Sequence, residues 1–136
     1  MNDHDEAAHV IGPCHPLKSG DLIEIDPSNV VAPFNVRRVY WIFNTIADAV
    51  RGRHAHKELW QLLIVPTGRC QVTLEDRHGR LNYVLDSRNK GLLVGPGVWR
   101  EMYDFSRDCV LTVLASQPYE QADYIRDYDE FKRMVP

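Results

Sequence analysis

Two histidines separated by one small residue, His54 and His56 around Ala55, form the pattern in this sequence that is best suited to chemistry. On a helix, residues two apart point roughly 200° away from each other, whereas on a strand they share one face. Glycines stand on both sides, at Gly52 and Gly68, in a chain rich in strand-forming residues. The spacing therefore predicts a strand that carries both imidazoles on one side.

The surroundings of these imidazoles decide between acid-base chemistry, metal binding and a plain surface position. If the shared face lines the interior of a small β-barrel, both rings enter one concave pocket; otherwise they are solvent-exposed. Two neutral imidazoles alone are a poor zinc or iron site, because such metals normally take three or four protein ligands. Glu58 could supply a third ligand, so metal binding stays an alternative. The main prediction is a site without metal or cofactor.

An imidazole that titrates near neutral pH can remove a proton from a carbon beside a carbonyl and return one elsewhere, typically contributing about 10² to 10⁴ in rate. Isomerisation of a ketone needs this step together with donors facing the enediolate oxygens. Arg38 and Tyr40 alternate within an apolar run and are predicted to project to one face. The Tyr40 hydroxyl could pass a proton between neighbouring oxygens; alternatively, Tyr40 is a core aromatic with a hydrogen-bonded tip.

A second group of candidate residues, Trp99, Arg100 and Tyr103, follows a glycine-proline corner at 95–97. An arginine can grip phosphate in bidentate fashion, and an aromatic face suits a nucleotide base. The same residue types also serve as packing and rim residues. Arg51 and Arg53, at the entrance of the predicted histidine strand, are equally explained as solvated charges.

Short apolar runs between turn signals predict the elements that must position these side chains. Turn-forming residues separate the runs at 66–68, 76–80 and 95–97. Only the tail, from about Asp127 through Met134, has a helical pattern, with acidic residues early and basic residues late. The sequence thus predicts an all-β fold with a short C-terminal helix. The predicted strands span residues 21–25, 35–43, 59–65, 69–75, 81–85, 91–94 and 109–115.

Length and charge limit the class of protein further. The 136 residues suffice for one domain, which we expect at residues 20–136 after a flexible lead-in at 1–19. A net charge of -3 argues against a nucleic-acid-binding protein, and no apolar run approaches the roughly 18 residues of a membrane span. The acidic, polar N-terminus lacks the features of an export signal, so a cytoplasmic location is expected.

The three cysteines, Cys14, Cys70 and Cys109, are widely spaced and form no pair typical of zinc or redox sites. Cys70 and Cys109 lie in apolar, strand-like runs. We expect both to be buried as small hydrophobic residues.

The glycines and the histidine pair resemble the first cupin motif, and Gly91 followed by Pro96 and Gly97 resembles the second. Metal-binding cupins add a Glu shortly after the histidine pair and a third His after the second motif. Here the first of these positions falls at Trp60 or Gln61, and the region after Gly97 contains no histidine.

Longer segments resemble the sugar 3,4-ketoisomerases, cupins that act on dTDP-4-keto-6-deoxyglucose, from about residue 20 to the C-terminus. The matching segments are PFNVRRVY at 33–40, RGRHAHK at 51–57, GL at 91–92 with WREM at 99–102, and LAS at 114–116 with Tyr119 and DYIRDY at 123–128. The resemblance implies a cupin, a small jelly-roll-like β-barrel. It also implies metal-independent conversion of a dTDP-linked 4-keto-6-deoxyhexose to its 3-keto isomer, for dideoxy-amino-sugar biosynthesis, by a homodimer with swapped N-terminal strands.

By this resemblance, His54 is the base that takes the C3 proton, His56 is its close partner, and Tyr40 moves protons between the sugar oxygens. Three alternatives stay open: an epimerase-like cupin, a non-catalytic sugar-nucleotide binder and a metal-dependent cupin. Protonation of C4 from one face gives a galacto product and from the other a gluco product, and both stay open. The candidate substrate-binding residues are Arg51, Arg38, Gln61, Trp99, Arg100 and Tyr103.

Overall fold

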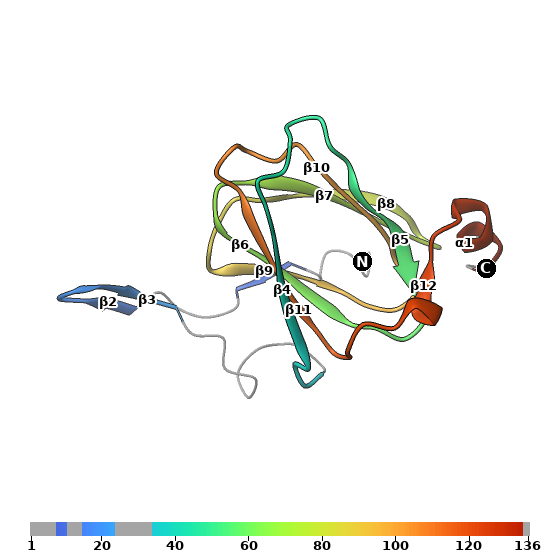
Figure 1. Cartoon of the computed structure of the whole chain (residues 1–136), viewed down its shortest axis with the longest axis horizontal. Coiled ribbons are helices and arrows are strands. Elements are labelled where there is room, and N and C mark those ends of the chain that lie inside the picture. The colour runs from blue at the N-terminus through green and yellow to red at the C-terminus, as the bar shows by residue number, and fades with distance from the viewer. Residues whose placement is uncertain (1–7, 11–14, 24–33, 135–136) are drawn as a thin grey trace.

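The computed structural model describes residues 8–10, 15–23 and 34–134, most of which lie in antiparallel strands (Figure 1). One five-stranded sheet has the order β1 (Ala8–Val10), β9 (Lys90–Val94), β6 (Gln61–Thr67), β11 (Val110–Ala115) and β4 (Arg38–Phe43). The other has the order β12 (Tyr124–Ile125), β5 (Arg51–His56), β10 (Trp99–Tyr103), β7 (Cys70–Asp76) and β8 (Gly79–Leu85). The two sheets face each other.

Four further elements lie outside these sheets. The strands β2 (His15–Leu17) and β3 (Gly20–Leu22) pair as a hairpin that projects away from the two sheets (Figure 1). A 3-10 turn, Gln121–Asp123, precedes β12, and α1 (Tyr128–Met134) ends the described chain. No helix among the described residues is long and apolar enough to cross a membrane.

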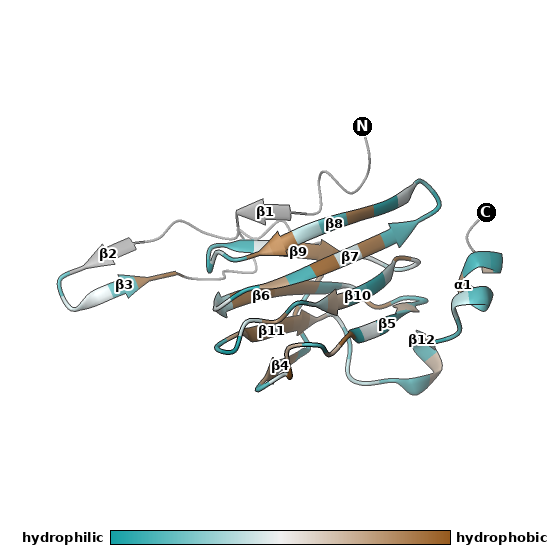
Figure 2. Cartoon of the chain, turned by 90° about the horizontal axis from the view of Figure 1, so that it is seen from above, coloured by the Kyte–Doolittle hydropathy of each residue, from teal (hydrophilic) through white to brown (hydrophobic). Residues whose placement is uncertain are grey.

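The core lies between the sheets because alternate residues of each strand point inward. In β7, Cys70, Val72 and Leu74 are buried in this core, while Gln71 and Thr73 face outward. Figure 2 shows the apolar residues concentrated along the central strands and polar residues at the β7–β8 turn and on α1. The strand predicted at 69–75 is confirmed as β7. Cys109 is also buried in the core, as expected, whereas Cys14 lies outside the described residues.

The all-β prediction with a C-terminal helix is confirmed, and most predicted strands coincide with observed ones. Several of the predicted boundaries were wrong. The turn predicted at 66–68 begins later, because Thr67 still pairs with Val110, and the connection predicted at 76–80 is only the two residues between β7 and β8. The predicted strand at 35–43 starts at Arg38, and the one at 21–25 is described only to Leu22 within β3. The end of the strand predicted at 21–25 lies outside the described residues.

Two strands, β5 and β10, were absent from the apolar runs because charged residues interrupt their hydrophobic pattern. The segment expected to be a lead-in contains strands β1 and β2, of which β1 pairs with β9. A domain boundary at residue 20 stays a prediction.

Candidate active site

The two histidines lie on β5, between β12 and β10, and they face the interior between the sheets. His54 pairs with Arg100, which in turn pairs with the core residue Leu74, and residues paired across an antiparallel ladder share a face. The two imidazole rings meet edge to face with their centroids 4.8 Å apart. The prediction that both rings share one face of a strand is therefore confirmed. His56 is completely buried, whereas His54 is partly buried.

The hydrogen bonds of the two rings determine which nitrogen of each carries the proton. The Nδ1 atom of His54 lies 3.0 Å from the carbonyl oxygen of Gly52, which can only accept, so Nδ1 donates and Nε2 keeps its lone pair. The Nδ1 atom of His56 lies 3.0 Å from Oδ2 of Asp123 and donates in the same way. Its Nε2 atom is buried with no partner among the described residues. Both rings thus have Nε2 as a proton acceptor.

Burial and a nearby cation keep both rings neutral. Burial, reinforced by the Arg100 guanidinium, lowers the pKa of His54 to about 4. The same two causes lower the pKa of His56 to about 2, with the neighbouring His54 adding to the effect. At neutral pH both imidazoles are therefore free bases rather than imidazolium ions.

A bulge in β5 brings the carbonyl of Gly52 to His54. The pairing of β5 with β10 shifts between Arg100 and Glu101, and Arg53 is the extra residue on the β5 side. Gly52 has a φ of 85° and Arg53 a φ of 54°, both in the left-handed region. A Cβ atom on Gly52 would lie 2.9 Å from the backbone oxygen of Arg100, so only glycine fits. The sequence motif Gly-x-His has its structural explanation in this bulge.

Residues of the opposite sheet complete the site. Tyr40 on β4 lies opposite Val113 of the core, and Gln61 at the start of β6 lies opposite Ala115. The Gln61 amide donates to the Tyr40 hydroxyl oxygen at 3.0 Å and accepts a hydrogen bond from Nη1 of Arg100 at 2.6 Å. Burial raises the pKa of the Tyr40 phenol, so the hydroxyl is protonated at neutral pH. The Arg38 guanidinium lies 5.2 Å from the centre of the Tyr40 ring.

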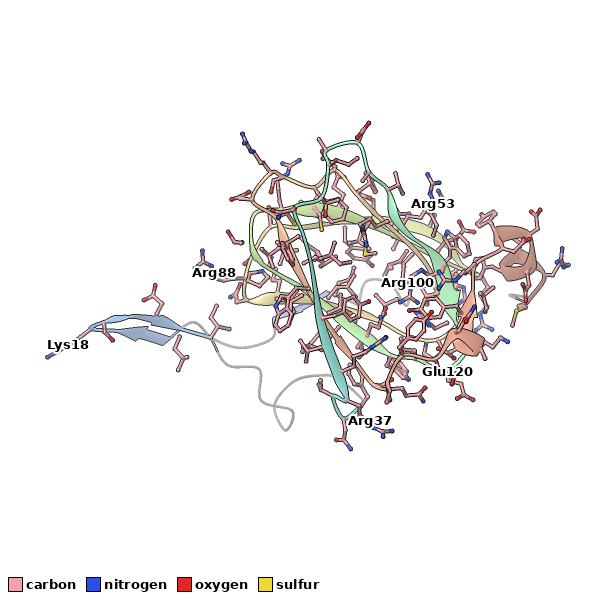
Figure 3. All side chains as sticks on the ribbon, in the orientation of Figure 1. Lys18, Arg37, Arg53, Arg88, Arg100 and Glu120 are labelled. Carbon is pink, nitrogen blue, oxygen red and sulfur yellow. The ribbon has the colours of Figure 1, made fainter. Side chains whose placement is uncertain are left out.

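Arg100 is the buried cation of this site. It is 1% exposed and lies between the sheets near β5 and β12, whereas Arg37, Arg53 and Arg88 lie at the periphery (Figure 3). Among the described residues it forms no ion pair with a carboxylate. Burial lowers the pKa of its guanidinium to about 10. A buried guanidinium without a counter-ion can stabilise negative charge that develops on a ligand.

The chain after β11 supplies residues to which the sequence assigned no role. Asp123 holds His56 and also accepts hydrogen bonds from the backbone N–H groups of Glu58 and Leu59. The Tyr124 ring lies 4.9 Å from the His54 ring and 4.4 Å from the His56 ring. The Arg126 guanidinium covers the Tyr124 ring at 4.1 Å. The sequence indicates the segment at 123–128 only through the family resemblance.

Three predicted binding residues lie away from this cluster in the described chain. Trp99 faces the opposite side of its sheet, where it contacts Tyr128 and Phe131 of α1. Tyr103 shares that outer face and donates to Asn82 of β8. Arg51 is exposed at the start of β5. The structure thus brings together His54, His56, Tyr40, Arg38, Gln61 and Arg100, but not Trp99, Tyr103 and Arg51.

The described residues contain no group of three His, Cys, Asp or Glu side chains arranged to hold a metal ion. Glu58, the third ligand considered from the sequence, has an exposed position next to the site. The donor set of the described site consists of neutral imidazoles, a phenol and a guanidinium, which suits proton transfer better than metal binding.

The fold and the site define a cupin-type β-barrel with two histidines, a tyrosine and a buried arginine between its sheets. The chain belongs to the WxcM-like, C-terminal family (FdtA), whose family model matches residues 13–136. It is 48% identical over 116 residues to a TDP-4-oxo-6-deoxy-alpha-D-glucose-3,4-oxoisomerase of Aneurinibacillus thermoaerophilus. This match covers 85% of the present chain and 83% of the relative.

Two solved structures agree with this assignment. A mutant of the 3,4-ketoisomerase QdtA from Thermoanaerobacterium thermosaccharolyticum, in complex with TDP-4-keto-6-deoxyglucose, has a TM-score of 0.88 at 36% identity and covers 95% of this chain and 94% of its own. A 3,4-ketoisomerase from Helicobacter canadensis has a TM-score of 0.86 at 41% identity, and the match covers 94% of this chain and 96% of that protein's chain. The chain is therefore an isomerase of the 3,4-ketoisomerase kind.

Proposed function

We propose that this chain converts TDP-4-keto-6-deoxyglucose to a TDP-linked 3-keto-6-deoxyhexose, through an enediol and without a metal ion. The observation that carries the proposal is the pair of neutral imidazoles, both with Nε2 as acceptor, next to the Tyr40 hydroxyl and the Arg100 guanidinium. Such a set holds a base for a carbon-bound proton, a hydroxyl donor and a cation for a developing oxyanion.

The reaction moves one carbon-bound hydrogen and one oxygen-bound proton. Nε2 of His54 takes the proton from C3, and the electrons of the C3–H bond form the C3–C4 double bond while the C4 oxygen takes up negative charge. The Tyr40 hydroxyl gives its proton to the C4 oxygen and takes the proton of the C3 hydroxyl. The protonated His54 then returns a proton to C4, and the C3 oxygen becomes the ketone. No external oxidant or reductant is needed.

The remaining groups act on charge and position. His54 has a low pKa and is therefore a weak base, so stabilisation of the enediolate must supply much of the rate enhancement. Arg100 supplies a fixed positive charge within the same hydrogen-bonded cluster. His56, neutral and held by Asp123, has Nε2 free to accept a hydrogen bond from a substrate hydroxyl. Arg38 and Arg126, whose guanidinium groups lie over tyrosine rings of the site, supply positive charge for the diphosphate.

The decisive experiment is incubation with TDP-4-keto-6-deoxyglucose in deuterated buffer, followed by NMR of the product. We expect a 3-keto sugar nucleotide, in either the galacto or the gluco configuration, with deuterium at C4 to the extent that the protonated His54 exchanges with solvent before it returns the proton. A His54→Asn variant should bind the substrate but exchange no hydrogen. A 4-keto product with inverted configuration beside the ketone would indicate an epimerase instead. Binding without exchange by the wild-type protein, or activity that a chelator abolishes, would contradict the proposal.

We propose that the active form is a homodimer. Strand β4 lies at the edge of its sheet and exposes a row of apolar side chains, Val39, Trp41 and Phe43, which are 43%, 58% and 61% exposed. An exposed apolar row on an edge strand is typical of a surface that another chain covers. The hairpin β2–β3 projects from the barrel, and an isolated two-stranded hairpin is marginally stable without a partner. Both features support a dimer; the exchange of N-terminal strands is what the family resemblance implies and stays a prediction, since β1 pairs with β9 of its own chain.

Light scattering coupled to size-exclusion chromatography tests the dimer. Trp41→Asp should shift the mass from dimer to monomer, because it places a charge within the apolar row. Val84→Asp, at a 50% exposed apolar residue on the edge strand of the other sheet, is the matched control and should stay dimeric. A wild-type protein that elutes with the mass of one chain would contradict the dimer. The expected cytoplasmic location stays a prediction.

A further inference from the structure

Gln61 is a buried polar side chain whose two ends are both engaged. It is 2% exposed and lies on the inner face of β6, opposite Ala115 of β11 and Val94 of β9. Its Oε1 atom accepts from Nη1 of Arg100 at 2.6 Å, and its Nε2 atom donates to the Tyr40 oxygen at 3.0 Å. The amide therefore connects the buried cation to the catalytic phenol.

The direction of this connection is fixed by the chemistry of Arg100. A guanidinium has only N–H donors, so the amide must turn its oxygen toward Arg100. The amide NH2 group then faces Tyr40, and the phenol oxygen has to accept. The single hydrogen of the Tyr40 hydroxyl is consequently not used in the bond to Gln61.

Arg100 is itself held in one orientation. Its Nη2 atom donates to the backbone oxygen of Val98 at 2.8 Å, and its strand pairs on both sides, with β5 and β7. Because the guanidinium is buried and cannot lose its charge at neutral pH, the amide of Gln61 has no alternative orientation that satisfies it. The direction of the two hydrogen bonds that run from Arg100 through Gln61 to Tyr40 is therefore fixed.

We propose that Gln61 is a positioning residue that keeps the Tyr40 hydroxyl hydrogen free for the substrate oxygen. The inference rests on the proposed function, in which Tyr40 moves protons between the C3 and C4 oxygens. In this role Gln61 acts through Tyr40 and not by contact with the substrate, unlike the binding role expected from the sequence. The neutral amide matters because a carboxylate of the same shape would reverse the bond to Tyr40.

Gln61→Glu is the direct test, because it changes the hydrogen-bond direction at almost constant shape. A carboxylate beside Arg100 is ionised and only accepts, so the Tyr40 hydroxyl would donate to it instead of to the substrate. We expect kcat to fall about 100-fold while KM changes by less than about threefold. The melting temperature should not fall, because the new charge is paired with a buried cation.

A second readout separates this role from packing. The Arg100 guanidinium lowers the pKa of His54, and a carboxylate beside it offsets that effect. The acid limb of kcat/KM should therefore move to higher pH in Gln61→Glu. Gln61→Met, which has similar length but no polar end, frees the Tyr40 hydroxyl to rotate and should lower kcat by only about tenfold without moving the acid limb. Gln121→Glu, the same change at an exposed position, should behave as wild type.

The outcomes distinguish this inference from the proposed function. A Gln61→Glu variant with the wild-type kcat would overturn the inference alone, as would a raised KM with unchanged kcat, since that pattern indicates direct substrate binding. If Gln61→Glu does not fold, a wild-type kcat in Gln61→Met overturns it equally. Absence of any 3-keto product with the wild-type protein would overturn the proposed function.

Discussion

Replacing Asp123 by Asn tests the tautomer of His56, and with it the acid-base assignment of the whole site. The carboxylate accepts from His56 Nδ1 at 3.0 Å and Leu59 N at 3.3 Å through Oδ2, and from Glu58 N at 2.8 Å through Oδ1. An asparagine keeps the shape but turns one of the two oxygens into an NH2 donor. The hydrogen bonds that the replaced oxygen accepted can therefore no longer form in the same way.

The distances decide which orientation the new amide adopts. If its NH2 group replaces Oδ1, it faces the Glu58 N–H and loses the shortest bond of the three, at 2.8 Å. If its NH2 group replaces Oδ2, only the 3.3 Å bond to Leu59 is lost outright, and the amide can donate to His56 Nδ1 after the ring changes tautomer. The second orientation is favoured. His56 would then carry its proton on Nε2 and could no longer accept there.

We expect Asp123→Asn to lose about 1.5–3 kcal/mol of folding free energy, the usual contribution of hydrogen bonds to a charged group. We expect kcat to fall about 100-fold, because an inverted tautomer removes the acceptor at Nε2. NMR of the product gives kcat, and ring ¹⁵N chemical shifts report the tautomer. Asp127→Asn, which affects only a backbone contact at the start of α1, is the control. A normal rate with an unchanged tautomer would refute the reasoning.

Three further predictions concern the base, the bulge and the helix contact. The pKa of His54 is lowered from 6.5 to about 4, so kcat/KM should fall as the pH drops through about 4 and not through 6.5. The free energy of unfolding should already decline below pH 6.5, because there the unfolded chain takes up a proton on His54 that the folded chain does not. A pH-rate profile with its acid limb near 6.5 would argue against a neutral buried base. Gly52→Ala should lower both melting temperature and kcat, since its Cβ atom meets the Arg100 backbone and moves the carbonyl that holds His54; a Gly52→Ala enzyme with wild-type activity would contradict the role of the bulge. Trp99→Ala should cost about 3–5 kcal/mol in denaturant unfolding, because Trp99 packs against Phe131. A large rise in KM with unchanged stability would instead restore Trp99 as a binding residue.

Much of the fold could be predicted because its signals are local. The alternation of Cys70, Val72 and Leu74 requires only the period of a strand, and the shared face of His54 and His56 follows from the same period. The family resemblance added the cupin fold and the isomerase class, and the comparisons with relatives confirm both. Strand β5 was predicted from the histidine spacing alone, and β10 was missed, because charged residues break the apolar pattern of both strands; in β10 the burial of Arg100 between the sheets depends on its tertiary partners.

The binding residues show where reasoning from a sequence cluster fails. Trp99, Arg100 and Tyr103 were grouped because they lie within five residues. On a strand, however, neighbours face opposite sides, so Arg100 points into the site while Trp99 and Tyr103 point outward. Strand periodicity applied to this segment would have separated them.

The sequence by itself determined the strand pattern, the shared face of the two histidines and, through its motifs, the class of enzyme. Only the tertiary structure decided the protonation state of those histidines, because Asp123 lies 67 residues from His56 and reaches it through the pairing of β12 with β5. The link from Arg100 through Gln61 to Tyr40 likewise joins strands of two different sheets. The direction of a hydrogen bond depends on partners that meet only when the sheets close on each other, and no local pattern in the chain encodes that meeting.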